Sequence, residues 1–346
     1  MVNVILSRPA PRLCEDVSQA VGDVPSVRLR RVASVCERVD CYVKLESCNP
    51  GGSIKEKNAA ILVGQAEKEG LLRPGGTIIE SSSGNFGVGL AMIGAARGYR
   101  VIIVVDAKTT PTFRRMLLAY GAQLAEVQEV DAAGSMQKAR IALATSLAQS
   151  IDGGWYPCQH YNPRNPDAHA LLTAREIEAT FGGRLDALVV GVSTGGQLSG
   201  LARYLKPRYP HLKLIGVDVQ GSVIFDPDPA PYKMTGIGLS FRPPNLDYTA
   251  IHAAYVVPEN LAYSMCNALA RQEGLLLGSS SGAIVAAGLH FARDLAAGSR
   301  IAMINPDHGD RYLETIYDQD WLSKNGFVLI PPEHMDVAIE QLKPAG

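Results

Sequence analysis

The sequence predicts an α/β protein with mostly parallel sheets and helices on both faces. Short apolar runs rich in valine and isoleucine alternate with longer segments of helical character along most of the chain. The runs at 101–105 and 187–191 lack the polar alternation of a half-exposed strand, as expected for strands buried on both sides of a parallel sheet. This alternation favours an α/β fold over separate helical and β regions.

The first half of the chain follows this order. After a loop and a short helix within 1–25, strands are expected at 27–29 and 41–46. A helix over 53–70 would have Ser53 as its N-cap and would stop at Gly70. The elements after it are a buried strand at 77–80, a Gly- and Ala-rich helix at 84–97, the strand at 101–105, a helix at 111–120, a strand at 123–127 and a helix at 133–150.

The second half continues the alternation. Residues 221–249 form a Pro- and Gly-rich stretch that is too long for an ordinary connection, so we expect it to be functional. The length of 346 residues suits two lobes that meet near residue 160. Helices are expected at 164–181, 194–204, 258–273 and 280–296, and strands at 187–191, 212–219, 254–257 and 300–304.

Composition argues against several classes of protein. Hydrophobic residues make up 47% of the chain and charged residues 19%, which supports a well-filled core. The formal net charge is −1 without a long basic tract, so a nucleic acid partner is not expected. No apolar run reaches the length of about 18 residues that a membrane span needs, and the N-terminus does not resemble a signal peptide. The six cysteines form no CxxC pair, which favours reduced thiols in the cytoplasm over structural zinc.

Lys55 is the candidate catalytic residue. It lies in Asn49-Pro-Gly-Gly-Ser-Ile-Lys55, after the strand at 41–46 and at the start of the next helix. The positive end of the helix dipole disfavours a further positive charge, so this amine should lose its proton readily and attack an aldehyde. Taken alone, such a lysine is more often simply solvated.

Small-residue loops before helices strengthen the hypothesis. In Ser193-Thr-Gly-Gly-Gln197, glycines would let free N–H groups at a helix start approach a phosphate. The loop Ser81–Gly87 suits a carboxylate, and its Asn85 suits a phenolic oxygen, while a serine of Gly278–Gly282 would bond a ring nitrogen. For each loop, the alternative is a tight turn or an ordinary capped helix without a ligand.

Together these segments resemble those of the cysteine synthase and cystathionine β-synthase family of pyridoxal-phosphate (PLP) enzymes, which have the type II, tryptophan synthase β-like fold. The similarity runs from about residue 20 to about residue 320, with the motifs in the family's order. Asn49–Lys55 resembles the Schiff-base lysine motif. Ser82–Gly87 resembles the substrate loop of the family but differs from it at Ser82 and Phe86. Ser193–Gln197 resembles the phosphate loop but differs from it at Ser193 and Gln197. Gly236-Ile-Gly238 resembles a loop that faces the cofactor, Ser280-Ser-Gly282 the pyridine-nitrogen serine, and Gln159 a glutamine of the substrate site.

The resemblance implies a PLP-binding homodimer without a metal site. It implies a smaller mobile domain over 48–158, a larger domain over 1–47 plus 159–325, and a C-terminal extension over 326–346. Lys55 would hold the cofactor as a Schiff base and act as general base, and Ser280 would leave the ring nitrogen unprotonated, which favours β-elimination. PLP is expected at Lys55, Asn85, Ser193, Thr194, Gly195, Gly196, Gln197 and Ser280, and the amino acid substrate at Ser82, Ser83, Gly84, Asn85, Phe86, Gln159, His160 and Gly236.

A closer similarity links the chain to N-(2-amino-2-carboxyethyl)-L-glutamate synthases. These enzymes join O-phospho-L-serine to L-glutamate and supply 2,3-diaminopropionate for siderophores. The similar segments are Val104–Lys108, Gly221–Phe225 and Pro306–Leu313, extended by Trp321, Leu322 and Lys324, and His160 stands where a tyrosine is expected. Arg140 would suit an acceptor carboxylate and Arg242 a phosphate leaving group; the alternative for both is a solvated arginine.

The leading hypothesis is therefore a PLP-dependent β-replacement synthase that forms a C–N bond. A cysteine synthase that uses sulfide is the alternative within the same chemistry. A catalytically silent binding protein with this fold is disfavoured because Lys55 and all the loops are intact. A dinucleotide-dependent oxidoreductase is disfavoured because no GxGxxG motif follows a strand.

Overall fold

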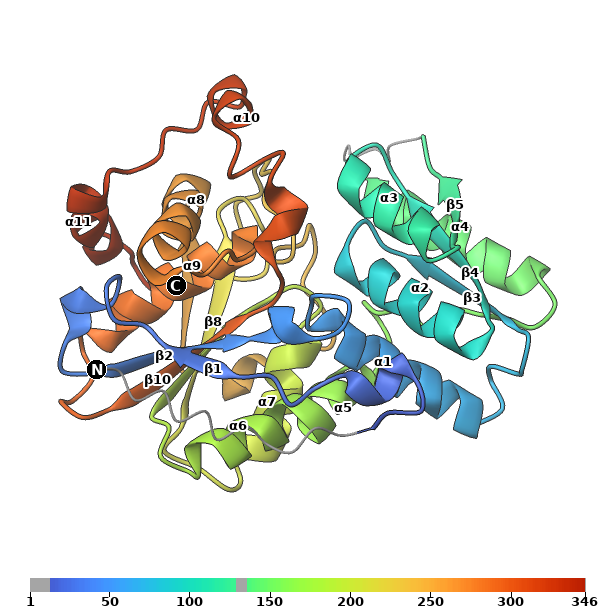
Figure 1. The fold of residues 1–346 in the computed structure, drawn as a ribbon, viewed down its shortest axis with the longest axis horizontal. Coiled ribbons are helices and arrows are strands. Elements are labelled where there is room, and N and C mark those ends of the chain that lie inside the picture. Colours follow the sequence, from blue (N-terminus) through green and yellow to red (C-terminus); the bar gives the residue numbers. More distant parts are fainter. Residues whose placement is uncertain (1–12, 129–135, 346) are drawn as a thin grey trace.

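Two sheets form the framework of the molecule (Figure 1). The computed structural model describes residues 13–128 and 136–345. The larger sheet has the strand order β1-β2-β10-β7-β8-β9 and the smaller one β5-β4-β3-β6. Among the described residues, all pairings between these strands are parallel except that of β1 with β2, which confirms the expected α/β class. The strands are β1 (Ser26–Arg28), β2 (Asp40–Leu45), β3 (Thr77–Ser81), β4 (Arg100–Val105), β5 (Gln123–Glu126), β6 (Gly154–Trp155), β7 (Ala187–Gly191), β8 (Lys213–Val219), β9 (Ala253–Val257) and β10 (Arg300–Asn305).

Helices connect the strands and begin and end at residues suited to those places. The hydroxyl of Thr110 accepts a hydrogen bond from the Phe113 N–H, and Pro111 opens the helix that follows, where its missing N–H costs nothing. The α-helices are α1 (Lys55–Lys68), α2 (Asn85–Arg97), α3 (Pro111–Ala119), α4 (Met136–Ser150), α5 (Asn165–Ala168), α6 (Ala174–Phe181), α7 (Gly196–Leu205), α8 (Glu259–Ala268), α9 (Ser279–Ala292), α10 (Gln319–Lys324) and α11 (Met335–Glu340).

The structure corrects the expected elements in several places. The N-cap of α1 is Ile54, not Ser53, although the Ser53 hydroxyl accepts a hydrogen bond from the Lys55 N–H at 3.3 Å while it donates to Glu56. The expected helices at 164–181 and 258–273 each contain a π turn, at His169–Thr173 and Leu269–Glu273. The predicted start of α4 at 133 lies outside the described residues. The short elements β6, α10 and α11 were not predicted, since so few residues carry no clear hydrophobic period.

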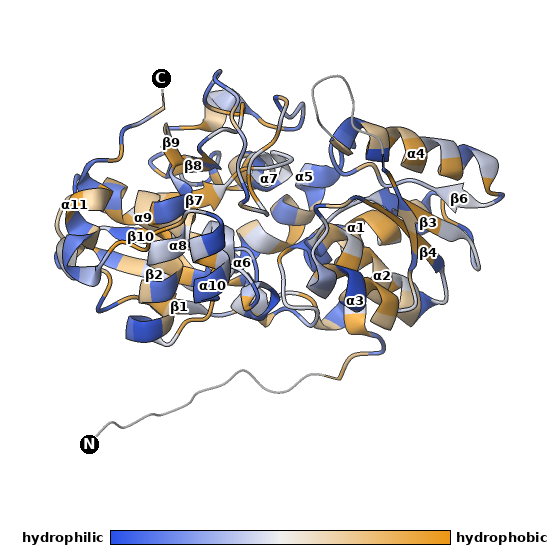
Figure 2. Cartoon of the chain, turned by 90° about the horizontal axis from the view of Figure 1, so that it is seen from above, coloured by the Kyte–Doolittle hydropathy of each residue, from blue (hydrophilic) through white to orange (hydrophobic). Residues whose placement is uncertain are grey.

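Helices cover both faces of the larger sheet, and its strands alternate between two cores. Val189 and Met303 pack with Ile284 of α9 on one face, whereas Leu188 and Ile304 pack with helix α7 residues on the other. Figure 2 shows apolar residues concentrated along these strands and along the helix surfaces that meet them. Burial on both faces explains why β7 and β10 read as continuous apolar runs.

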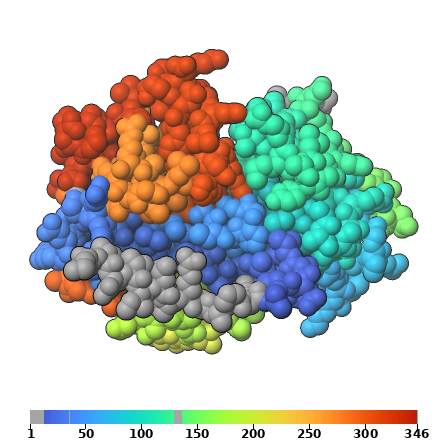
Figure 3. Space-filling view, viewed as in Figure 1, coloured from blue at the N-terminus to red at the C-terminus, as the bar shows by residue number. Residues whose placement is uncertain are grey.

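The smaller sheet is built only from strands between residues 77 and 155. It therefore falls inside the predicted smaller domain, although the boundaries at 48 and 158 stay a prediction. Figure 3 shows a notch at the top of the molecule, between the green-cyan surface of this part and the orange-red surface of the C-terminal part. Loops that follow β3, β7 and β10 leave the carboxyl ends of parallel strands, which is where open α/β sheets bind their ligands.

Candidate active site

Lys55 is the first residue of α1, and most of its side chain is enclosed by protein. Burial lowers the pKa of the Lys55 amine to about 8, and the nearby Asp307 carboxylate opposes this shift. Desolvation, rather than the helix dipole that we expected from the sequence, is therefore the principal cause. An amine with this pKa has a larger neutral fraction near neutral pH than an ordinary lysine, and the neutral form can attack an aldehyde.

The loop before Lys55 is held in place by its own neighbour, Glu56. The two carboxylate oxygens of Glu56 accept hydrogen bonds from the Gly51 N–H at 2.9 Å and from the Ser53 N–H and hydroxyl at 2.9 Å each. The Ile54 N–H donates to the carbonyl of Pro306 at 2.8 Å. This loop, residues 49–54 and here called the lysine loop, is thus hydrogen-bonded to the segment that follows β10.

The loop 193–197 connects β7 to α7 and has the form of an anion site. Gly195 has a φ of +81°, and a Cβ there would lie 2.6 Å from the Leu246 backbone nitrogen. A Cβ on Gly196 would lie 2.4 Å from Oδ1 of Asn165. Nδ2 of the same asparagine donates a hydrogen bond to the Thr194 hydroxyl at 3.1 Å. Among the residues that the structure describes, no side chain caps α7, so its first N–H groups are available to a ligand beside the partly exposed Ser193.

The loop 82–86 connects β3 to α2. The Ser82 hydroxyl is buried and accepts a hydrogen bond from the Gly87 N–H at 3.0 Å, so it shapes the loop itself. Ser83 and Gly84 are partly exposed, whereas Phe86 is buried. Asn85 opens α2, and its Nδ2 donates to Oδ2 of Asp307 at 2.7 Å.

Ser280 and Gly236 meet across the site. Gly278 is the N-cap of α9, so Ser280 does not have the alternative role of an ordinary helix cap. The Ser280 hydroxyl is buried and has no hydrogen-bond partner among the described residues. A Cβ on Gly236, whose φ is +94°, would lie 3.2 Å from that hydroxyl. An unpartnered buried hydroxyl is costly unless a ligand satisfies it.

Gln159 and His160 lie at the end of the segment that follows β6. Gln159 donates from Nε2 to the Ser81 carbonyl at 3.4 Å, which places it beside the loop after β3. His160 is buried and packs edge-to-face on Phe241, with ring centroids 5.7 Å apart. Burial lowers the pKa of His160 to about 3, and the charges of Arg140 and Lys55 add to this effect. His160 is therefore neutral at ordinary pH and belongs to the surroundings of Lys55.

The two candidate arginines have different environments. Arg140 is buried on α4, with Nε 2.9 Å from a carboxylate oxygen of Asp106, so it is not the solvated helix arginine of the alternative reading. Burial lowers the pKa of Arg140, and Asp106 opposes the shift. Arg242 is exposed and stacks over the Tyr248 ring at 5.1 Å from its centroid, as the surface alternative predicted.

Sequence reasoning missed the polar groups that support these residues. Asp307 and Arg311 lie in the segment Pro306–Leu313, whose sequence suggests no role for them, and their side chains are buried against Asn85. Glu80 is buried at the end of β3, where its carboxylate accepts the N–H groups of Ser81 and Gln159 at 2.8 and 3.3 Å. Burial raises the pKa of Glu80 to about 8. The only available signal was that these acids stand at the carboxyl ends of apolar strands.

These residues form a donor set that fits PLP. An enclosed amine suits an aldehyde, a glycine-rich helix start suits a phosphate, and an unpartnered serine hydroxyl suits a ring nitrogen. Nε2 of Gln197 is also buried without a hydrogen-bond partner among the described residues. Within the same residues, no cluster of three or more His, Cys, Asp or Glu side chains could hold a metal ion.

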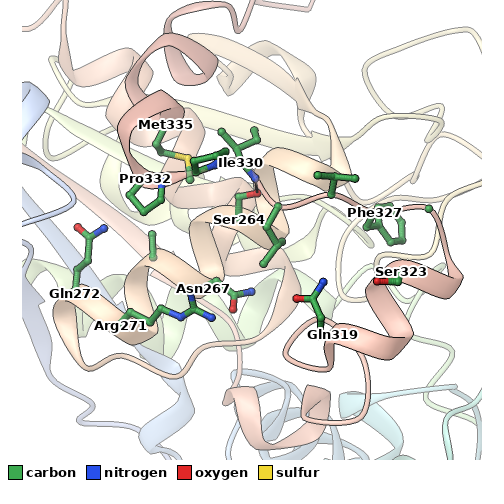
Figure 4. Close-up of a pocket in the computed structure, with 15 residues that line it drawn as sticks. Ser264, Asn267, Arg271, Gln272, Gln319, Ser323, Phe327, Ile330, Pro332 and Met335 are labelled. Carbon is green, nitrogen blue, oxygen red and sulfur yellow. Dashed lines mark hydrogen bonds between the residues drawn. The ribbon is translucent and has the colours of Figure 1, made fainter.

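A separate cavity of about 770 Å³ lies away from these loops (Figure 4). Its walls come from α8, the π turn after it, α10 and the segment from Gly326 to Met335. Arg271, Asn267 and Gln319 lie along the lower side in this view, Ile330 lies above them beside Pro332 and Met335, and Phe327 lies to the right beside Ser323. It contains no residue of the candidate active site. In 13–128 and 136–345, no helix is long and apolar enough to cross a membrane.

Residues 17–307 match a family described as pyridoxal-phosphate dependent enzymes. The chain belongs to this family. PLP is therefore its cofactor, and the expected two-sheet type II architecture agrees with the solved structures that resemble it. This PLP-dependent enzyme is 36% identical over 308 residues to a cysteine synthase of Staphylococcus aureus strain Mu50, covering 88% of this chain and 97% of that protein.

Other relatives of this PLP-dependent enzyme are equally distant. A cystathionine β-synthase of Apis mellifera is 37% identical over 326 residues, covering 92% of this chain and 64% of that protein. The structure of an O-ureido-L-serine synthase matches with a TM-score of 0.83 at 35% identity, over 90% of this chain and 100% of that chain. An O-acetylserine dependent cystathionine β-synthase from Helicobacter pylori matches with a TM-score of 0.84 at 34% identity, over 89% of this chain and 100% of that chain.

Proposed function

We propose that this enzyme is a β-replacement synthase that joins O-phospho-L-serine to L-glutamate, giving N-(2-amino-2-carboxyethyl)-L-glutamate and phosphate. The observation that carries the β-replacement chemistry is the enclosed Lys55 amine, with a pKa lowered to about 8, in one site with the unpartnered Ser280 hydroxyl. The product would supply 2,3-diaminopropionate for a siderophore or another secondary metabolite.

The cofactor would be held at both of its ends. Lys55 would bind its aldehyde, the N–H groups of the 193–197 loop its phosphate, Ser280 its ring nitrogen and Asn85 its phenolic oxygen. When bound, PLP withdraws electrons from the α-carbon of the amino acid donor and so allows the β-substituent to leave.

The chain's own residues would then move the proton and hold the donor. The Lys55 amine, once free, removes the α-proton and later returns it, for which a pKa near the working pH is suited. N–H groups of the loop 82–86 hold the donor carboxylate at the start of α2, where the helix dipole favours an anion. A serine at the ring nitrogen donates a hydrogen bond without giving up its proton, which favours elimination over transamination.

Phosphate and glutamate are proposed because the segments Val104–Lys108, Gly221–Phe225 and Pro306–Leu313 resemble those of enzymes with these substrates. A glutamate acceptor carries two carboxylates and needs a cation. Arg140 is a buried cation, and its charge contributes to the lowered pKa of His160. It is already paired with Asp106. Arg242 is less suited to the leaving phosphate because its side chain is exposed on the Tyr248 ring.

A cysteine synthase is the second candidate. It is favoured by the 36% identity to a cysteine synthase across 97% of that protein's length. Sulfide needs no cation in the acceptor site, so this function would leave Arg140 with only its structural partner Asp106.

A product assay separates the two candidates. Purified enzyme loaded with PLP is given O-phospho-L-serine or O-acetyl-L-serine, then L-glutamate or sulfide, and the product is identified by mass. A product with the mass of N-(2-amino-2-carboxyethyl)-L-glutamate, formed only with both amino acids and absent with Lys55→Ala, would support the proposal. Cysteine as the only product would assign a sulfhydrylase, and no product from either donor would reject β-replacement on serine derivatives.

A further inference from the structure

The side-chain amide of Asn85 is held from both ends by the segment after β10. Its Nδ2 donates to Oδ2 of Asp307 at 2.7 Å, and its Oδ1 accepts a hydrogen bond from the guanidinium of Arg311. Asn85 opens α2 beside the smaller sheet, whereas Asp307 and Arg311 follow a strand of the larger sheet. The contact therefore joins residues that belong to different sheets.

This contact determines which way the amide faces. A carboxylate accepts hydrogen bonds but does not donate them, and a guanidinium donates but does not accept. The oxygen of Asn85 must therefore face Arg311, and its nitrogen must face Asp307. A reversed amide would place two donors together on one side and two acceptors on the other, each at the cost of an unsatisfied buried group.

Both holding residues are themselves anchored and buried. Asp307 is 1% exposed, and its Oδ2 also accepts the Tyr312 hydroxyl at 2.6 Å. Arg311 is 5% exposed, and its second arm donates to the carbonyl of Gly51 in the lysine loop. A Cβ on Gly52 would lie 2.7 Å from that arm, so little room remains for Arg311 to move.

Within 13–128 and 136–345, one N–H of the Asn85 amide has no acceptor after these contacts. An amide nitrogen has two hydrogens, and Asp307 takes only one of them. We propose that Asp307 and Arg311 are positioning residues that orient Asn85, so that its second N–H is presented to the phenolic oxygen of PLP. The proposal deepens the role given to Asn85 above and does not depend on which donor or acceptor the enzyme uses.

The test is a double-mutant cycle read out by cofactor binding. Apoenzyme is titrated with PLP, and the dissociation constant and the visible spectrum are recorded for wild type, Arg311→Met, Asn85→Ala and the double variant. Loss of the contact that orients the Asn85 amide should weaken PLP binding about tenfold in Arg311→Met. In the Asn85→Ala background, Arg311→Met should lose most of its effect, with only the part that comes from its contact with Gly51 remaining, and both single variants should show the same spectral shift.

Matched variants separate orientation from general stability. Arg115→Met removes an exposed arginine that pairs with Glu314 at 3.0 Å, and it should leave the dissociation constant unchanged. Asp307→Asn keeps an acceptor for the amide and should lose less affinity than Asp307→Ala. If Arg311→Met does not fold, the cycle is run with Asp307→Ala, Asp307→Asn and Arg311→Lys.

Two outcomes would overturn the proposal. One is an equal loss of PLP affinity from Arg311→Met with and without Asn85, which would assign Arg311 to the lysine loop alone. The other is a lowered thermal unfolding midpoint with unchanged PLP affinity and spectrum, which would make the contact purely structural. Because no substrate is added, neither outcome can be confused with a failure of the proposed reaction.

Discussion

Lys57 and Glu46 form an ion pair that solvent does not reach. Nζ of Lys57 lies 2.8 Å from a carboxylate oxygen of Glu46, and both side chains are 0% exposed. Glu176 lies 2.8 Å from the same ammonium and 2.5 Å from that of Lys44. These four side chains connect β2 and the turn after it with α1 and α6, and Nδ2 of Asn49, in the loop before Lys55, donates to the Glu46 carboxylate at 2.9 Å.

Replacement of Lys57 by methionine should destabilise the protein by about 3–5 kcal/mol, because it leaves a buried carboxylate without its closest partner. Urea unfolding of the apoprotein at pH 7 measures this loss. Arg203→Met is the matched control, since Arg203 pairs with Asp167 at 2.6 Å on the surface and should contribute less than about 1 kcal/mol. Equal losses of unfolding free energy in the two variants would show that burial does not increase the contribution of the Lys57–Glu46 pair to stability.

Removal of Lys55 should stabilise the apoprotein at neutral pH. Burial lowers the pKa of its amine from 10.5 to about 8, so between these values the unfolded chain binds more protons than the native one. The free energy of unfolding should therefore rise as pH increases from about 8 to 10.5, where the amine loses its proton. Below pH 8 the amine is charged in both states, and burial of the charged lysine destabilises the folded protein fully. Apo Lys55→Met should exceed the wild type by about 1–3 kcal/mol at pH 7.

Urea unfolding at pH 7 and near pH 10.5 checks this prediction. The difference between apo Lys55→Met and apo wild type should shrink towards zero at the higher pH. Lys68→Met, which alters an exposed lysine at the other end of α1, is the matched control. A difference that does not change with pH would mean that the Lys55 amine has an ordinary pKa in the folded protein.

A methyl group on Gly195 should weaken cofactor binding strongly. Its Cβ would lie 2.6 Å from the Leu246 backbone nitrogen, so the loop 193–197 must shift. Gly195→Ala should raise the PLP dissociation constant about 100-fold, since several N–H contacts to one phosphate depend on this loop. Gly298→Ala is the control, because Gly298 has a similar φ of +83° but open space around it. Comparable PLP affinity in both variants would argue against a phosphate site at this loop.

Glu56→Gln should disturb the lysine loop although it changes little in size. Each carboxylate oxygen of Glu56 accepts at least one hydrogen bond from Gly51 or Ser53, and a glutamine turns one of these acceptors into a donor. We expect PLP affinity to fall about tenfold. Glu69→Gln, at the exposed end of the same helix, should leave it unchanged. Titration of the two apoenzymes with PLP compares their dissociation constants. A Glu56→Gln variant with the wild-type dissociation constant would show that Glu56 does not support the cofactor site.

Much of the fold could be predicted because its signals are local. Apolar runs such as 101–105 and 187–191 identify buried strands from side-chain type alone, and Gly- and Ser-rich stretches mark the loops that follow. Lys55, Asn85, Thr194 and Ser280 all lie in such loops or at helix starts, so their approximate positions followed from the alternation of elements. The two-residue strand β6 and the π turns gave no comparable signal.

By itself, the sequence determined the α/β class, the order of the elements and the loops that surround Lys55, since neighbouring residues specify all three. Tertiary structure alone decided what those loops touch. Asn85 meets Asp307 across 222 residues of chain, and Arg140 is buried against Asp106 rather than solvated. The lowered pKa of Lys55 and the unpartnered hydroxyl of Ser280 also come from packing. Desolvation and hydrogen-bond pairing depend on which distant segments meet, and the spacing of residues along the chain does not specify that.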